Sequence, residues 1–244
     1  MTPAARLSAA IEIVADIEAR HRPAPEALKD WGLSHRFAGS GDRAALAGLV
    51  YDALRRRASS VHVMGDPSPR AILLGMLRLE RKLEADAIAV LANGERFAPQ
   101  PLSAEEQKRL ALPDLEGAPP WVAGDYPEWL DPYLARVFGE ERAEEGAALA
   151  SRAPLDLRAN SLKASRDEAA RSLADLAPES TRWSPQGLRI KLRADAKSPA
   201  VHAEFANQPV YLRPRNRRLC AGNRWSGALP RQRPGHHRAP TGPF

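Results

Sequence analysis

The stretch Pro154–Glu168, PLDLRANSLKASRDE, separates two parts of the chain that differ in hydrophobic periodicity. Its first residues, LDLRA, alternate between apolar and polar side chains, which is the period-2 pattern of a half-buried strand. The pair Ser165-x-x-Glu168 then forms a capping box, and a capping box marks the start of a helix. The stretch therefore predicts a strand, a short turn and a helix.

Upstream of this stretch the pattern is helical. Apolar residues recur at helical spacing from Leu7 onward, Thr2-Pro3 is a helix start, and prolines and glycines end the individual runs. Gly39-Ser40-Gly41 looks like half of a phosphate-binding loop, but no strand leads into it, so we expect an ordinary loop that ends at a helix cap, Asp42. We predict an all-helical bundle with short connections over residues 1–152.

Downstream, the period changes to that of strands. Leu188–Arg193 alternates strictly between apolar and cationic residues, after the predicted helix and a Ser-Pro-Gln-Gly turn. The resulting β-α-β-β order suggests part of a ferredoxin-like unit, which one more helix and strand would complete. The fold class is therefore mainly α: a helical bundle is followed by a small α+β domain over residues 153–205. This domain is expected to be incomplete if the last strand of the ferredoxin-like unit is missing.

The last segment, residues 206–244, has a composition of its own. It holds eight arginines and no acidic residue, and its prolines and glycines interrupt any period, which predicts a disordered tail. Without these arginines the chain has 28 basic and 30 acidic residues, so the net charge of +6 belongs to the tail. Two explanations stay open: a basic nucleic-acid-binding arm, or a GC-rich gene read in a shifted frame.

Composition bounds the class of protein. A hydrophobic content of 43% suffices for packed cores, and a single cysteine excludes a disulfide framework and a four-cysteine zinc site. No signal peptide or apolar run of membrane-spanning length is visible, so we expect a cytoplasmic protein without a membrane partner, and a monomer. His236-His237 is too weak a signal for a metal site, and no metal is expected.

The segment Leu157–Lys163, LRANSLK, resembles the LRxNxLK signature of the Sun/RsmB family of ribosomal RNA cytosine-5 methyltransferases. Residues 36–57, RFAGSGDRAALAGLVYDALRRR, also resemble bacterial members of that family. The resemblance covers roughly residues 1–205. It implies a NusB-like helical domain followed by a small RNA-binding domain, with ribosomal RNA as the partner and S-adenosylmethionine as the cofactor of the intact family.

Candidate RNA-binding residues follow from the chemistry of the side chains. Arg158, Asn160 and Lys163 place a guanidinium, an amide and an ammonium at one strand end, and these groups suit phosphates and base edges. A solvated strand edge is the alternative. Weaker candidates lie on the second alternating strand or at a basic helix end, where cations also favour the helix dipole: Arg189, Lys191, Arg55, Arg56 and Arg57.

No catalytic or cofactor-binding residue is predicted. Leu219–Gly222 is similar to the family's cofactor loop, but Arg218 stands where an acid is required, and Cys220 lies outside the family's catalytic settings. We therefore expect a fragment of an S-adenosylmethionine-dependent rRNA (cytosine-5) methyltransferase that keeps RNA-binding regions, does not bind the cofactor and is itself inactive. The alternatives are a stand-alone NusB-like RNA-binding or antitermination module and a plain protein-interaction bundle.

Overall fold

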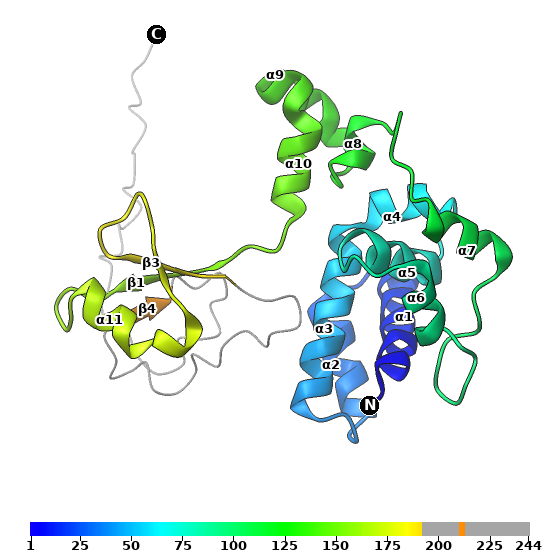
Figure 1. The fold of residues 1–244 in the computed structure, drawn as a ribbon, viewed down its shortest axis with the longest axis horizontal. Coiled ribbons are helices and arrows are strands. Elements are labelled where there is room, and N and C mark those ends of the chain that lie inside the picture. Colours follow the sequence, from blue (N-terminus) through cyan, green and yellow to red (C-terminus); the bar gives the residue numbers. More distant parts are fainter. Residues whose placement is uncertain (192–209, 213–244) are drawn as a thin grey trace, which may run out of the picture.

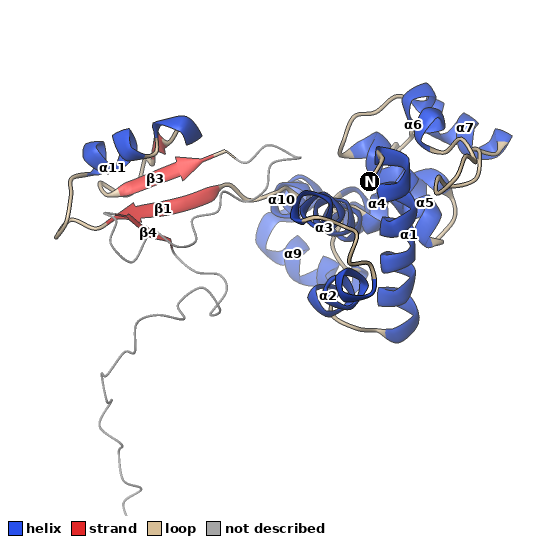
Figure 2. Cartoon of the chain, turned by 90° about the horizontal axis from the view of Figure 1, so that it is seen from below, coloured by secondary structure: helices blue, strands red, loops and turns tan. Residues whose placement is uncertain are grey.

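A computed structural model describes residues 1–191 and the backbone of residues 210–212 (Figure 1). Within these residues a group of helices precedes a small sheet, as the change of period in the sequence predicts (Figure 2). The helices of the first group are α1 (Pro3–Arg20), α2 (Ala24–Ser34), α3 (Ser40–Arg55), α4 (Arg57–Met64), α5 (Pro69–Leu79), α6 (Ala85–Leu91) and α7 (Ala104–Ala111).

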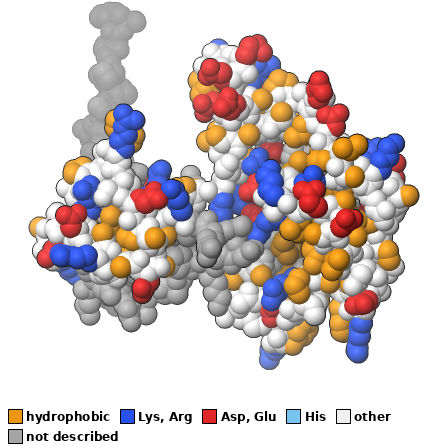
Figure 3. Space-filling model, in the orientation of Figure 1, with side chains coloured by type: hydrophobic (Ala, Val, Ile, Leu, Met, Phe, Trp, Pro, Cys, Tyr) orange, Lys and Arg blue, Asp and Glu red, His pale blue; other side chains and the backbone are white. Residues whose placement is uncertain are grey.

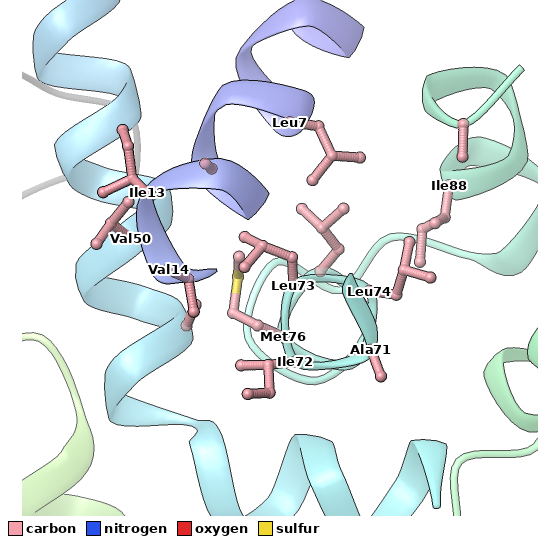
Figure 4. Packing of buried hydrophobic residues seen from close by; sticks show 14 of the residues in the cluster. Leu7, Ile13, Val14, Val50, Ala71, Ile72, Leu73, Leu74, Met76 and Ile88 are labelled. Carbon is pink, nitrogen blue, oxygen red and sulfur yellow. The ribbon is translucent and has the colours of Figure 1, made fainter. Parts of the chain in front are cut away.

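Helix α5 is the centre of the bundle. All its residues from Ala71 to Leu77 are buried, and a helix that is apolar on every side needs neighbours all round. It packs against α1, α3, α4, α6 and α7, and Figure 4 shows its side chains meeting those of Leu7, Val14 and Ile88. Gly75 lets α4 approach closely, because a Cβ there would lie 2.8 Å from the Cβ of Ser60.

The start of α3 differs from the prediction. Ser40 and Gly41 belong to its first turn, and Gly39 is the N-cap residue. Asp42 therefore does not cap the helix. Its carboxylate instead accepts a hydrogen bond from the Nε of Arg6, at 2.9 Å, and pairs with the amino terminus of Met1, at 3.3 Å. The carboxylate that the sequence pattern assigns to the helix cap therefore forms ion pairs instead.

A second helical layer follows the bundle. It contains α8 (Pro120–Ala123), η1 (Glu128–Leu130), α9 (Asp131–Phe138), η2 (Gly139–Glu141) and α10 (Arg142–Ala150). Helix α10 packs on α8 and α9, and α8 contacts α4. Among the described residues, the buried cluster of the bundle ends at Leu110, and the buried apolar side chains of this second layer are Val122 and Tyr126.

The strand elements are β1 (Leu155–Ala159), β2 (Glu179–Ser180), β3 (Gly187–Ile190) and β4 (Val210–Leu212), with α11 (Arg166–Ser172) and η3 (Ala174–Leu176) between β1 and β2. The predicted capping box is confirmed, since the backbone N–H of Glu168 donates to the Oγ of Ser165. The sheet order is β2-β3-β1-β4 with antiparallel neighbours, which is the order of a ferredoxin-like fold. Helix α11 covers one face, where Leu157 pairs with Leu188.

Strand β4 corrects the sequence-based reading of the end of this domain. It lies beyond residue 205, within the predicted tail, and its residue Tyr211 pairs with Arg158 of β1. The sheet therefore has the fourth strand that the sequence analysis allowed to be missing. Val-Tyr-Leu suits a strand, and the free edge of β1 offers it unpaired backbone groups. The rest of the predicted tail lies outside the described residues.

Candidate nucleic-acid interface

An open groove of about 970 Å³ lies beside the carboxyl end of β1. Its lining combines the predicted signature with the turn between β2 and β3, which we call the β2–β3 turn (Thr181–Gln186). The lining residues are 156–162 of β1 and the turn after it, with Thr181, residues 183–187 and Arg189. The fold thus brings Arg158 and Asn160 together with a segment more than twenty positions further along the chain.

The β2–β3 turn is held by backbone hydrogen bonds. The N–H of Thr181 donates to the carbonyl of Gly187 at 3.1 Å, and the N–H of Gly187 donates to the carbonyl of Ser184 at 3.0 Å. The N–H of Ala159 donates to the carbonyl of Gln186 at 2.8 Å, which fastens the turn to β1. These three bonds fix the wall of the groove relative to the signature residues.

Arg158 is the cation best placed to meet a ligand in this groove. It is exposed on β1, and the sheet register sets it opposite Gly187, which carries no side chain. Within residues 1–191 its guanidinium makes no ion pair or hydrogen bond. Lys163 is likewise exposed, and its ammonium has no partner in the described part of the chain. Both predicted cations are therefore available to phosphate.

Asn160 has a structural task. Its Oδ1 accepts a hydrogen bond from the N–H of Leu162 at 3.2 Å, and its backbone carbonyl accepts from the N–H groups of Lys163 and Ala164. An Asn side chain that accepts from the backbone two residues on is an Asx-turn. The Asn of the signature therefore holds the turn that carries Lys163, and it also belongs to the lining of the groove.

The two weaker candidates on β3 are engaged by acids. Arg189 makes two hydrogen bonds to Asp156, at 2.7 and 2.8 Å, and Lys191 pairs with Glu179 at 2.8 Å. The Arg189 guanidinium holds the pKa of the Asp156 carboxyl below its usual range, so this pair is ionised at neutral pH. Both cations lie on the sheet face opposite α11, where these ion pairs neutralise their charge.

The arginine run at the junction of α3 and α4 is also paired. Arg55 pairs with Asp52, Arg57 pairs with Glu18 at 2.9 Å, and Arg56 pairs with Glu80 at 2.7 Å. Arg56 is largely buried, with 18% of its side chain exposed, whereas Arg57 is 51% exposed. The pairs of Arg56 and Arg57 thus link helices of the bundle, whereas that of Arg55 lies within α3, and a secondary RNA site at this run stays a prediction.

Sequence reasoning passed over Trp183. Its side chain is 83% exposed in the β2–β3 turn, and the guanidinium carbon of Arg182 lies 4.5 Å from the centre of the ring. An exposed indole is unusual, because large aromatic side chains are mostly buried. The available signal was an Arg-Trp pair in a loop between strands, next to a Ser-Pro turn.

The described residues contain no group of three or more side chains suited to a metal ion. Their strand-to-helix turn, residues 160–165, holds no glycine, so it does not fit the close backbone approach that a nucleotide-like cofactor requires. Leu219–Gly222, Cys220 and His236-His237 lie outside the described residues. No helix in residues 1–191 is long and apolar enough to cross a bilayer.

Comparison with known proteins assigns the sheet domain. Residues 126–197 match a family model described as "Methyltr_RsmF/B-like, ferredoxin-like domain". The recognition made from LRANSLK is thereby confirmed: this segment carries the ferredoxin-like domain of the RsmF/B-like methyltransferases. The match runs from residue 126 to residue 197, so it includes α9 and α10 as well as strands β1 to β3, whereas β4 lies beyond it.

Two further comparisons concern the whole chain. A solved structure titled "Crystal Structure of PH0851" is 17% identical, with a TM-score of 0.48, and the alignment covers 87% of this chain and 53% of that one. This chain therefore spans about half the length of that protein. None of the curated proteins compared matches it.

Proposed function

We propose that residues 1–191 and 210–212 form the RNA-binding part of a ribosomal RNA methyltransferase, with the groove beside β1 as the contact surface. The observation that carries this proposal is the pair of exposed cations, Arg158 and Lys163, on the family's signature segment, neither of which has an ion-pair partner among residues 1–191. Ion pairs neutralise the neighbouring cations Arg189 and Lys191. A phosphate backbone would meet these two charges first.

The finer assignment rests on the family resemblance. We propose S-adenosylmethionine as the methyl donor and C5 of a cytosine in ribosomal RNA as the acceptor for the intact protein. We further propose that this chain does not transfer methyl groups by itself. Holding the ribose of the cofactor requires a carboxylate, and residues 205–244 contain no acidic residue. Calorimetric titration with S-adenosylmethionine is expected to give no heat of binding, and saturable binding would refute this part.

The RNA proposal is tested with a fluorescent RNA hairpin that carries an unpaired loop. The variant R158A/K163A should lower the affinity by roughly 25-fold at 0.1 M salt, because each phosphate contact to single-stranded RNA contributes a slope of about 0.7 in log affinity against log salt. The salt slope should fall by about 1.4. Thermal unfolding should be unchanged, since both side chains are exposed.

The matched control is R189A/K191A, which removes the same charge from the same domain. If the proposal is correct, this control loses less affinity and keeps more of the salt slope than R158A/K163A. Equal losses in the two double variants would show that only net charge matters. Unfolding of the domain by R158A/K163A would show that these side chains are structural.

A further inference from the structure

The ferredoxin-like strand order raises the question of where this domain would hold a base. In RNA-binding sheets of this order, aromatic side chains on the open face of the sheet stack on bases. Here four of the described side chains on that face form ion pairs, Asp156 with Arg189 and Glu179 with Lys191, and Arg158 adds a further cation. The described part of the open face therefore offers charges in place of a stacking surface.

The aromatic surface lies instead in the β2–β3 turn. Trp183 is 83% exposed and belongs to the lining of the groove that contains Arg158. The guanidinium of Arg182 lies 4.5 Å from the centre of the indole and can cover only one face of it. The second face is open to a planar ligand. The guanidinium on the first face is attracted to the electron-rich ring.

Hydrogen-bonding groups suited to base edges lie beside this ring. Gln186 is half-buried in the groove wall, and its side-chain amide makes no hydrogen bond within residues 1–191. Amides carry both a donor and an acceptor, as base edges do. Arg158 provides a phosphate partner in the same groove. The groove therefore combines a stacking ring, an amide and a cation.

These groups select among RNA structures. In an A-form duplex the bases are stacked on one another and the major groove is too narrow for side chains, so an indole cannot reach a base face. An unpaired nucleotide in a loop or bulge exposes its base and can stack on an aromatic side chain. The exposed Trp183 thus favours unpaired RNA over duplex RNA.

We propose that this groove binds an unpaired RNA nucleotide, with its base stacked on Trp183 and its phosphate at Arg158. This inference deepens the proposed function and rests on it. The groove supplies recognition of a single-stranded element and no chemistry. Its preference for unpaired RNA would direct the chain to loops and bulges of a structured RNA.

The test compares two probes: a fluorescent RNA hairpin with an unpaired loop, and a fully paired duplex of equal length. The variant W183A should weaken binding of the hairpin by roughly 5- to 150-fold, the range found for loss of one base–aromatic stack. W183F should recover most of the affinity, because a phenyl ring also stacks. The salt slope should stay unchanged, since no phosphate contact is lost.

The matched control is W129A. Trp129 of η1 is 68% exposed, but it lies in the second helical layer, where Figure 3 shows acidic side chains gathered at one end. Removing it should leave hairpin binding as in the unmodified chain. Equal losses in W129A and W183A would overturn the inference, as would a loss in W183A that is equal for hairpin and duplex.

The inference and the proposed function can fail separately. If R158A/K163A weakens hairpin binding and W183A does not, the nucleotide site is wrong and the RNA-binding function stands. If neither variant weakens binding, both are wrong. Unfolding of W183A would be seen in circular dichroism, and W183F, which keeps a ring in the turn, would then decide between stacking and a structural role.

Discussion

Asp125 accepts two hydrogen bonds from Ser59, one from its backbone N–H at 2.8 Å and one from its hydroxyl at 2.7 Å, across 66 positions of sequence. Ser59 lies in the first turn of α4, where backbone N–H groups have no partner within the helix. Asp125 also pairs with Arg56 at 3.5 Å, and its side chain is 1% exposed. A residue of the second helical layer therefore caps a helix of the bundle.

The first prediction concerns this tether. Asp125→Ala should lower the free energy of unfolding by about 2–4 kcal/mol, because it leaves buried donors unpaired and puts alanine in a left-handed conformation. Asp125→Asn is the matched variant, since asparagine keeps an acceptor oxygen and tolerates that conformation. Urea unfolding followed by circular dichroism measures both. Equal midpoints for Asp125→Ala and the unmodified chain would show that the tether contributes nothing.

The second prediction concerns pH. Burial raises the pKa of the Asp125 carboxyl above its ordinary value of 3.8. As pH rises, the unfolded chain loses this proton first, so the folded state holds more protons across the window between 3.8 and the raised pKa. The contribution of this carboxyl to stability is complete below that window and is lost as pH rises through the folded-state pKa.

Asparagine does not titrate, so the comparison isolates this group. The stability of Asp125→Asn relative to the unmodified chain should rise as pH increases through the window and then level off. Urea unfolding of both proteins at a series of pH values gives the difference directly, because all other titrating groups cancel. A constant difference would show that the hydrogen bonds from Ser59 and the charge of Arg56 balance the effect of burial on the pKa, and a falling difference would show that they outweigh it.

The third prediction concerns Asp156. Since the Nε and Nη2 of Arg189 both donate to Asp156 in the groove lining, Asp156→Ala should release a cation for phosphate. The affinity for the RNA hairpin should rise, and the salt slope should steepen by about 0.7. Glu140→Ala is the control, because Glu140 is fully exposed on η2 and its loss changes the net charge equally. Equal gains in affinity in the two variants would show that only the net charge of the chain matters.

Local patterns in the sequence predicted the elements that depend on neighbours along the chain. The capping box at Ser165 has its partner three residues away, and the alternation of LDLRA predicts a strand without reference to the strands that pair with it. Both appear in the structure as expected. The apolar run of α5 likewise required burial, whatever surrounds it. The helix-to-sheet order followed from these patterns alone.

Features that depend on distant partners were not predictable in this way. Arg56 reads as a surface cation in the sequence, and only the fold brings Glu80 and Asp125 to it. Strand β4 is three residues long and lies in a segment rich in arginine and proline, so it has no period of its own. An exposed tryptophan such as Trp183 cannot be told from a buried one by its spacing.

The last prediction concerns Gly187, which joins the β2–β3 turn to β3. A Cβ at this position would lie 1.9 Å from the Oγ1 of Thr181 and 2.9 Å from the Cβ of Ser184. Neither neighbour can move away without losing hydrogen bonds: the Oγ1 of Thr181 donates to the carbonyl of Ser184 at 3.2 Å, and backbone hydrogen bonds tie both residues to Gly187. Gly187→Ala should therefore displace the turn and cost about 1–3 kcal/mol, the usual range for overpacking.

The displacement has a local readout and a matched control. The N–H of Ala159 donates to the carbonyl of Gln186, so its amide hydrogen should exchange faster in Gly187→Ala. Gly41→Ala should leave that exchange unchanged and slightly stabilise α3, because a Cβ there meets nothing within 4 Å. Adding Thr181→Ala removes the closest clash, so the double variant should recover part of the lost stability. Unaltered exchange at Ala159 in Gly187→Ala would mean that the turn adapts without moving, and that the wall of the groove does not depend on a glycine.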